Sequence, residues 1–528
     1  MRIETLGLAV CALVGVGCSS PDSPSLGLGP GSVTEERPDT PGSTLLFRFD
    51  ASDLPNIETF DSAQDNFRVH YTRTGTNGVP TGDADSSGVP DFVENVAATY
   101  EEVLAHYTTM GFRAPLSDAA ITDNGGDGKF DVYLVDFAST GDGNFSKDEC
   151  DTSNPEQCAG FVTQENDFVG YNYAPALHGI QTVSSHEFFH AVQAAYDTGQ
   201  GSVLSEGTAT WATETLYPDL EDLDHQVRGY LANADRSLDS PLLGPTDAFS
   251  YGSAIFFRFL EERYDITLIR ELWERCENGA GGNADPSWFE ELEPLLQDEV
   301  GITFDEAFLE FATWNLFTGA FADETRSYAD AEEWGELDMV DLQAPETVDP
   351  IRVYYAATNY YRVDPDERED LRAMLVVRPG EEAALDGLEM ILAAEGDAGY
   401  TQVVVVDDPT TATQTVDISN SNFLVVGVVN LLQSGDVKEP SLCVGTLTEV
   451  QTCRDTILGG AGGTGGTGGT GGTGGVGGAG GAPPATEPQG GEDDGGCGCR
   501  LGVTRPAVPG AGLAALLLAA ALRRRRRR

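Results

Sequence analysis

Two histidines, His186 and His190, stand four residues apart in the segment HEFFH and constrain how this part of the chain can fold. Residues with this spacing share one face of an α-helix, so both imidazoles can bind one metal ion when the segment is helical. Glu187 then lies on the neighbouring face, where it can act as general base on a metal-activated water molecule. The surrounding residues are apolar, which is typical of a buried helix. The segment therefore predicts a buried helix over residues 182–197 and a Zn²⁺ site containing both histidines.

A glutamate further along the chain is the predicted third zinc ligand. Residues 191–205 separate His190 from Glu206, which is enough to leave the first helix, cross a glycine-containing turn and begin a second helix. A carboxylate in the first turn of that second helix would face the two imidazoles. Glu214, two turns further along, is the competing candidate, and we expect it to lie outside the ligand set or at the surface.

The HExxH motif followed by Glu206-Gly207-Thr208-Ala209 resembles the gluzincin clan of zinc metallopeptidases. It also resembles a family of zinc metalloproteases of bacterial surfaces that carries an upstream D-x-D-x-x-G-x-P-D loop, and this resemblance covers roughly residues 65–265. The resemblance implies an α+β zincin-like domain that hydrolyses peptide bonds, with Glu187 as the general base.

A tyrosine segment downstream resembles a second part of the same clan. The sequence FSYGSA, residues 249–254, is similar to the gluzincin segment whose tyrosine hydroxyl stabilises the oxyanion, which implies a catalytic role for Tyr251. The spacing departs from the aminopeptidase pattern by one residue, and the lysine of that pattern is missing. A core tyrosine whose hydroxyl is satisfied locally is therefore the alternative.

These residues favour a zinc endopeptidase over two other functions. An aminopeptidase of the same clan is one alternative, but the sequence has no recognisable GxMEN-type segment to capture an N-terminal amine. A non-catalytic adhesin on a zincin scaffold is the other. Retention of Glu187 beside two metal-binding histidines argues against it, because a scaffold has no use for a general base.

An acidic segment upstream has the oxygen pattern of a calcium loop. In residues 83–94, oxygen-bearing side chains occupy positions 1, 3, 5, 9 and 12, and a glycine stands at position 6. A helix predicted over residues 92–110 leaves the loop, as a calcium loop requires. The candidate Ca²⁺ ligands are Asp83, Asp85, Ser87, Asp91 and Glu94. A solvated turn that caps the helix is the alternative.

The charge of the chain limits its partners. Lys and Arg number 30 against 86 Asp and Glu, which gives a formal net charge of -56. A general affinity for nucleic acid is excluded, because phosphate binding needs a basic surface. Proteins or peptides are the expected substrates of an outward-facing hydrolase.

Both ends of the chain predict export. Residues 1–18 have the charged start and short apolar stretch of a signal peptide, and the sequence before Cys18 resembles a lipobox, so lipidation of Cys18 and plain signal-peptidase cleavage both stay open. Residues 19–43 are rich in Pro, Gly and Ser and are predicted to be disordered, as is the Gly-rich linker at 456–496.

Residues 497–528 combine two cysteines, an apolar stretch and six arginines. The apolar stretch predicts a short transmembrane segment with the arginines on its cytoplasmic side. The order of the three parts resembles the myxobacterial-type C-terminal sorting tag, which implies cleavage near the cysteines and display at the cell surface. We therefore expect a protein attached to the cell surface or outer membrane, or released from it.

Two folded domains are expected between the ends. Residues 44–345 form the predicted zincin-like metalloprotease domain, and residues 346–455, with short β-rich runs separated by turns, form a predicted all-β sandwich. In an exported chain, cysteines close in sequence pair by default, which predicts the disulfides Cys150–Cys158 and Cys443–Cys453 and leaves Cys276 without a mate.

Overall fold

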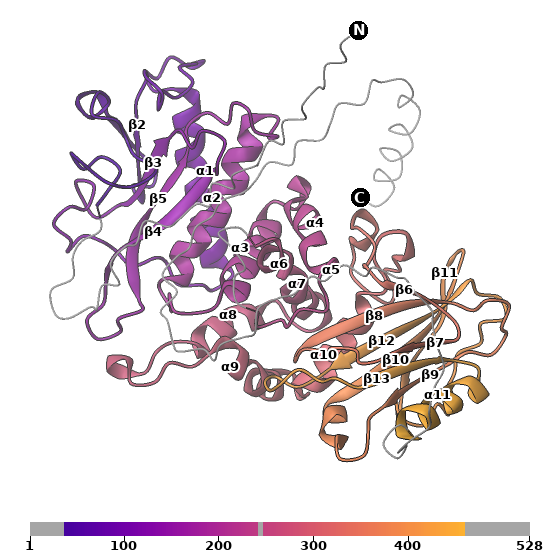
Figure 1. Ribbon diagram of the computed structural model, residues 1–528. Helices are drawn as coiled ribbons and strands as arrows, with labels where there is room; N and C mark the ends of the chain where they lie inside the picture. The colour runs from indigo at the N-terminus through magenta and orange to yellow at the C-terminus, as the bar shows by residue number, and fades with distance from the viewer. Residues whose placement is uncertain (1–35, 241–246, 460–528) are drawn as a thin grey trace, which may run out of the picture.

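The computed structural model describes residues 36–240 and 247–459, which form a mixed α/β structure with three β-sheets (Figure 1). An N-terminal sheet and a pair of C-terminal sheets lie at opposite ends, with a group of helices between them. The predicted signal peptide with Cys18, most of the 19–43 linker, the Gly-rich linker after residue 459 and the tag at 497–528 lie outside the described residues. Within those described, no helix has the length and apolar character to cross a membrane.

The N-terminal sheet has five strands in the order β1-β2-β3-β5-β4. Strands β2, β3 and β5 run parallel, while β1 and β4 run antiparallel at the two edges. Every residue of β5 is buried, as expected for an inner strand that is covered on both faces. The strands are β1 (Glu58–Asp61), β2 (Phe67–Tyr71), β3 (Phe130–Val135), β4 (Gly143–Cys150) and β5 (Cys158–Glu165).

Two helices, α1 (Asp91–Thr109) and α2 (Ala176–Gln193), cover one face of this sheet. The ring of Phe188 on α2 lies 5.2 Å from that of Phe67 and 6.0 Å from that of Tyr100, so helices and sheet share one aromatic core. The opposite face carries a separate apolar cluster, in which Phe47 and Phe49 pack against strand residues such as Tyr133 and Phe161. The segment before β1 is therefore part of the sheet's covering.

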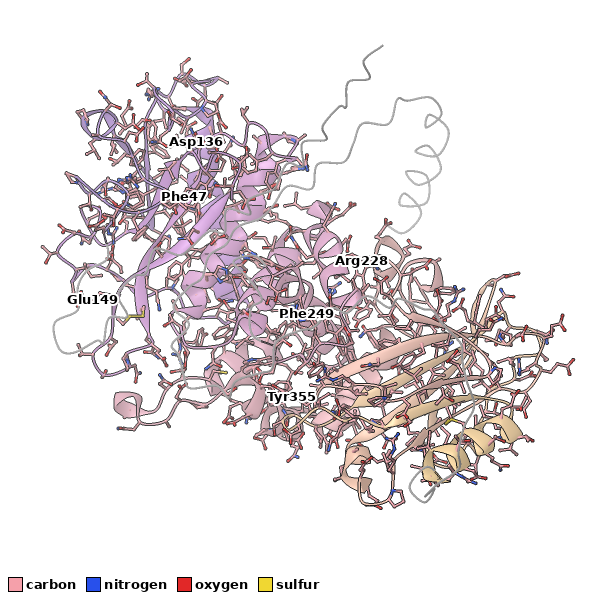
Figure 2. All side chains as sticks on the ribbon, in the orientation of Figure 1. Phe47, Asp136, Glu149, Arg228, Phe249 and Tyr355 are labelled. Carbon is pink, nitrogen blue, oxygen red and sulfur yellow. A yellow bond between two sulfur atoms is a disulfide. The ribbon has the colours of Figure 1, made fainter. Side chains whose placement is uncertain are left out.

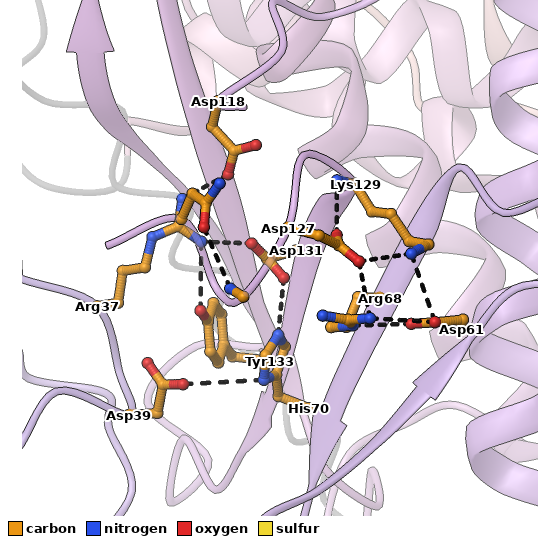
Figure 3. A network of polar contacts seen from close by, with 12 residues as sticks. Arg37, Asp39, Asp61, Arg68, His70, Asp118, Asp127, Lys129, Asp131 and Tyr133 are labelled. Carbon is orange, nitrogen blue, oxygen red and sulfur yellow. Dashed lines mark hydrogen bonds and ion pairs between the residues drawn. The ribbon is translucent and has the colours of Figure 1, made fainter. Parts of the chain in front are cut away.

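The predicted disorder of residues 19–43 is wrong for its last eight residues. Arg37 is only 2% exposed and forms ion pairs with three buried carboxylates, one of which, Asp118, lies 2.8 Å from Nη2 (Figure 3). Asp131 and Asp148 are the other two, and the Nε2 atom of His70 lies 2.7 Å from Asp131. The chain is ordered here because the arginine supplies a counter-charge to carboxylates that the fold has removed from water.

The central helices continue from α2 and bury a large apolar core. Gly207 on α3 allows a close helix contact, since a Cβ atom there would lie 2.7 Å from the ring of Phe257 on α7. A capping box between Thr303 and Glu306 begins α10. These helices are α3 (Ser202–Leu216), α4 (Asp222–Gln226), α5 (Arg228–Leu231), α6 (Ala248–Gly252), α7 (Ala254–Arg263), α8 (Thr267–Arg275), α9 (Trp288–Leu295) and α10 (Phe304–Trp314). Short helical turns occur at Leu54–Asn56, Pro218–Leu220, Ala280–Gly282, Leu296–Val300, Gly319–Phe321, Ala331–Glu333 and Glu382–Leu385.

The C-terminal part has two facing sheets, ordered β11-β10-β12-β8-β6 and β7-β13-β9. Residues such as Leu392, Val426 and Leu442 fill the space between them. The first strand begins at Val340, so the β region starts earlier than the expected residue 346. The strands are β6 (Val340–Gln343), β7 (Glu346–Val348), β8 (Ala357–Asp364), β9 (Arg372–Val376), β10 (Leu388–Gly396), β11 (Gly399–Val406), β12 (Phe423–Asn430) and β13 (Ser441–Gly445).

The inner strands of the larger C-terminal sheet are buried on both faces. Along β10, Met390 and Leu392 face the smaller sheet, whereas Ile391 and Ala393 join the core of the central helices. The hydroxyl of Tyr360 on β8 donates to the backbone oxygen of Ala312 on α10 at 2.6 Å. This sheet therefore connects the two parts of the structure directly.

A helix that the sequence analysis did not predict, α11 (Leu447–Gly459), packs on the outer face of the smaller sheet. It extends past residue 456, where the Gly-rich linker was expected to begin.

Both predicted disulfides are present. Cys443–Cys453 joins α11 to β13. Cys150–Cys158 lies beside Glu149 in Figure 2. Cys276 is buried with a free thiol, as expected.

Candidate metal centre

The helix that carries the HEFFH segment is α2, and it is the most deeply buried helix against the N-terminal sheet. It begins at Ala176, after Pro175, six residues before the predicted start, and ends at Gln193 rather than at residue 197. His186, Glu187 and His190 are all buried.

Three donor atoms converge between α2 and α3. The Nε2 atoms of His186 and His190 lie 3.2 Å apart. One oxygen of Glu206, in the first part of α3, lies 3.2 Å from the Nε2 atom of His186 and 3.5 Å from that of His190. The structure therefore brings together the three residues that the sequence predicts as zinc ligands.

The separations between these atoms allow a test of whether zinc fits. Zinc bonds of about 2.0–2.2 Å to nitrogen and oxygen, at tetrahedral angles, place neighbouring donor atoms about 3.3 Å apart. The three distances lie close to this value. Two imidazoles and one carboxylate are also a usual donor set for a catalytic zinc ion with one position open to water or substrate. The residues present therefore fit Zn²⁺.

Electrostatics keep the carboxylate of this group ionised. Burial alone raises the pKa of Glu206, but the charge of His190 and hydrogen bonding to both histidines outweigh it and hold that pKa well below its usual range. For His190 burial has the opposite effect and lowers the pKa. The neighbouring charge of Glu206 outweighs this effect and raises the pKa of His190 to about 9. An ionised carboxylate is what a cation requires of its ligand, and binding of the cation would displace the proton from His190.

A hydrogen-bond chain behind His190 orients this imidazole, and the sequence did not predict it. The Nδ1 atom of His190 lies 2.8 Å from the side-chain oxygen of Gln193. The Nε2 group of Gln193 donates to the backbone oxygen of Ser205 at 2.8 Å and to the hydroxyl of Thr208 at 3.0 Å. Gln193 thus ties the end of α2 to the start of α3. Its position one turn after His190 was the only signal of this role in the sequence.

Glu187 contacts the edge strand of the N-terminal sheet. Its Oε2 atom accepts the backbone N–H of Phe145, on β4, at 2.9 Å. Gly143 permits this approach, because a Cβ atom there would lie 2.5 Å from Val183 and 2.7 Å from the Cγ atom of Glu187. Strand β4 pairs with β5 on one side and is last in the order of the sheet. The strand edge and the candidate general base are therefore adjacent.

Tyr251 lies beside the metal-ligand group. It belongs to the short helix α6 and stacks on His186, with ring centroids 5.7 Å apart and an angle of 22° between the planes. Asp247 begins this helix by accepting the N–H of Phe249 at 3.2 Å. The structure thus places the predicted tyrosine next to the first histidine.

The competing ligand Glu214 lies elsewhere on α3 and is not in the ligand group. Burial raises its pKa to about 8, and the nearby charge of Asp224 adds to this effect, while Arg258 opposes it. Its side chain therefore faces a different environment from that of Glu206.

The structure brings together three of the predicted calcium ligands. Carboxylate oxygens of Asp83, Asp85 and Asp91 lie within 4.8 Å of one another, whereas the carboxylate of Glu94 is not in this group. Backbone N–H groups of the turn also bond to these carboxylates. Asp83 accepts from residues 87 and 88 at 3.0 Å, and Asp91 accepts from residue 84 at 3.0 Å. The arrangement suits a calcium ion and also a turn that begins α1.

A comparison with models of known protein families finds no match for this chain. A comparison with curated proteins finds none either.

Proposed function

We propose that this protein is an exported zinc metallopeptidase with a zincin-like domain followed by a β-sandwich. The observation that carries the proposal is the convergence of His186, His190 and Glu206 at mutual distances of 3.2, 3.2 and 3.5 Å. Glu187 follows the first of these ligands directly in the sequence, on the same buried helix. A structural zinc site would more often have four protein ligands and would not need a buried glutamate beside it.

The roles of the residues follow from their positions. A zinc ion in this place supplies Lewis-acid activation of a water molecule and of the substrate carbonyl. Glu187 is the group that takes the proton from the water and passes it to the leaving amine. The hydrogen bond from the N–H of Phe145 holds its carboxylate in place. Tyr251, stacked on His186, is the candidate hydroxyl donor to the oxyanion.

The edge of β4 supports a peptide as substrate. A strand at the edge of a sheet can pair with an extended peptide through backbone hydrogen bonds. Strand β4 has eight residues, and one of them contacts Glu187 directly. Binding of an extended peptide along the remaining backbone groups of this edge would favour an endopeptidase over an aminopeptidase.

Attachment and calcium binding complete the proposal. The tag at 497–528 and, in one alternative, a lipidated Cys18 would attach the enzyme to the cell surface or outer membrane. Calcium at Asp83, Asp85 and Asp91 would stabilise the start of α1, which packs against α2.

The test is metal content and proteolysis of the full chain. Elemental analysis of the wild type is expected to give one zinc per chain, and His190→Ala to lose it. Casein digestion by the wild type is expected to stop with a chelator and return with zinc. Glu187→Gln is the matched control, because it should keep the zinc and lose at least about 100-fold in rate. Peptides with blocked N-termini separate the alternatives, since an aminopeptidase cannot cleave them.

Absence of zinc from folded, zinc-supplemented wild type would refute the metallopeptidase. Zinc retained without proteolysis of any tested protein would favour the adhesin on a zincin scaffold.

A further inference from the structure

A second cluster of carboxylates lies where the two ligand-bearing helices are connected. Asp197 follows the end of α2, Glu156 lies in the turn between β4 and β5, and Asp285 lies in the segment before α9. One oxygen from each lies within 4.8 Å of the others. Three segments that are far apart in the sequence therefore present acidic groups to one place.

The described residues provide no cationic side chain that forms an ion pair with Glu156, Asp197 or Asp285. Asp197 is 1% exposed. Burial raises its pKa to about 7, and the charges of Glu156 and Asp285 act in the same direction. Buried carboxylates beside like charges are unfavourable unless a counter-charge compensates them. The cluster differs in this respect from the carboxylates around Arg37, which share a buried arginine.

An amide in the same place independently indicates a ligand. Asn278 is 9% exposed, and its Nδ2 group donates to the Oε2 atom of Glu156. Its Oδ1 atom is buried and has no hydrogen-bond partner. An unsatisfied buried carbonyl oxygen is unfavourable, and an amide oxygen is a common calcium ligand.

Backbone contacts hold the segments close to one another. The N–H of Gly199 donates to Asp197 at 2.6 Å. A Cβ atom at Gly199 would lie 2.6 Å from Oε1 of Glu156, so the two segments approach closely here. The N–H of Gly281 donates to the backbone oxygen of Ser153 at 2.8 Å, which joins the two outer segments. The acidic groups are thus positioned by the fold.

We propose that Glu156, Asp197, Asp285 and the side-chain oxygen of Asn278 form a calcium site. All four offer oxygen atoms, which hard divalent cations prefer, and the exposed side of Asp285 leaves room for the water molecules that complete a coordination shell of six to eight. The ion neutralises the carboxylates and satisfies the amide oxygen. It also links the turn between His190 and Glu206 to two other segments. This inference does not depend on zinc binding or on catalysis.

Calcium titration of the full chain by calorimetry, in calcium-free buffer with zinc present, tests the site. Asp285→Asn is expected to weaken one binding event by about tenfold or more, because it removes a charged ligand from an exposed position. Asn278→Ala is expected to weaken the same event without a change in net charge, which separates coordination from attraction to an acidic surface. Asp436→Asn, an exposed carboxylate outside any such group, is the charge-matched control.

Asp83, Asp85 and Asp91 form the other candidate calcium group, and a separate variant controls for calcium binding there. Asp85→Asn removes a carboxylate from the loop at 83–91 and is expected to leave the event that Asp285→Asn weakens unchanged. Calcium should also raise the thermal midpoint of the wild type more than that of Asp285→Asn. Equal calcium binding by wild type, Asp285→Asn and Asn278→Ala would overturn the proposal. Loss of this calcium-binding event in Asp85→Asn, with the event kept in Asp285→Asn and Asn278→Ala, would also overturn it.

Discussion

The Nδ1 atom of His190 lies 2.8 Å from the side-chain oxygen of Gln193, one turn further along α2. A glutamine oxygen only accepts hydrogen bonds, so the ring donates from Nδ1 and directs its Nε2 atom toward Glu206 and His186. Gln193 is itself held by Ser205 and Thr208 at the start of α3. One amide therefore sets the orientation of a ligand and its distance from the next helix.

Replacement of Gln193 by leucine is expected to lower zinc affinity by about 10–100-fold, because the imidazole loses its orienting partner. Competition with a chromogenic chelator measures this change. Gln193→Glu keeps an acceptor and should retain more of the affinity than Gln193→Leu. Wild-type affinity in the leucine variant would show that the contact does not orient the ligand.

Gly143→Ala tests the approach of β4 to Glu187. The added Cβ atom meets Val183 and Glu187 at 2.5 and 2.7 Å, so the strand must move away from Glu187, the proposed general base. We expect peptide hydrolysis to fall by about 10–100-fold, since displacement of a positioned group by about 1 Å has effects of this size, with zinc content unchanged. Gly396→Ala is the control, because a Cβ atom in that strand has no neighbour nearer than 3.6 Å. Equal activity of the two variants would contradict the prediction.

Arg37→Met is expected to destabilise the protein by about 3–5 kcal/mol at pH 7, because three buried carboxylates lose their counter-charge. Urea unfolding measures the loss. The carboxylates of the variant can be neutralised by protons, so the difference from wild type should shrink as the pH falls. Arg48→Met, an exposed change in the same segment, should stay within about 0.5 kcal/mol of wild type. An unchanged unfolding free energy in Arg37→Met would show that the network contributes little.

The raised pKa of Glu214 predicts that the stability of the folded protein depends on pH. Its pKa is raised from 4.5 to about 8 in the folded chain, mainly by burial. The folded state therefore binds this proton more tightly than the unfolded state, so the stability contribution is greatest below pH 4.5 and is lost as the pH rises toward 8. Glu214→Gln should unfold at higher urea concentration than wild type at pH 8.5, by a free energy on the order of a few kcal/mol, and should show little difference at pH 4.5. Zinc content should be unaffected, and its loss would restore Glu214 as a ligand.

The grouping of the candidate zinc ligands was predictable because their geometry is local. The spacing of His186 and His190 determines that both share one face of a helix, and a short turn limits where Glu206 can lie. The pairing of the cysteines was predictable for the same reason, since each pair is separated by 8 or 10 residues.

What the sequence analysis missed depends on contacts between distant residues. Arg37 binds carboxylates that lie 81 to 111 residues away, so no local pattern marks it as buried. The N–H of Phe145 reaches Glu187 across 42 residues, and its role follows only from the position of β4 at the sheet edge. Helix α11 has a weak apolar pattern of its own, and a few buried residues such as Val450 hold it on the smaller sheet.

The alternation of Met390 and Ile391 along β10, with one toward each core, also determines how the protein unfolds. Removal of either core exposes apolar surface on the sheet that both cores share, so neither half is expected to persist without the other. Heat should therefore produce one cooperative transition across the described chain, with equal calorimetric and van't Hoff enthalpies. A cut at residue 345 separates two stretches of sequence, but it is not expected to give two independently stable modules.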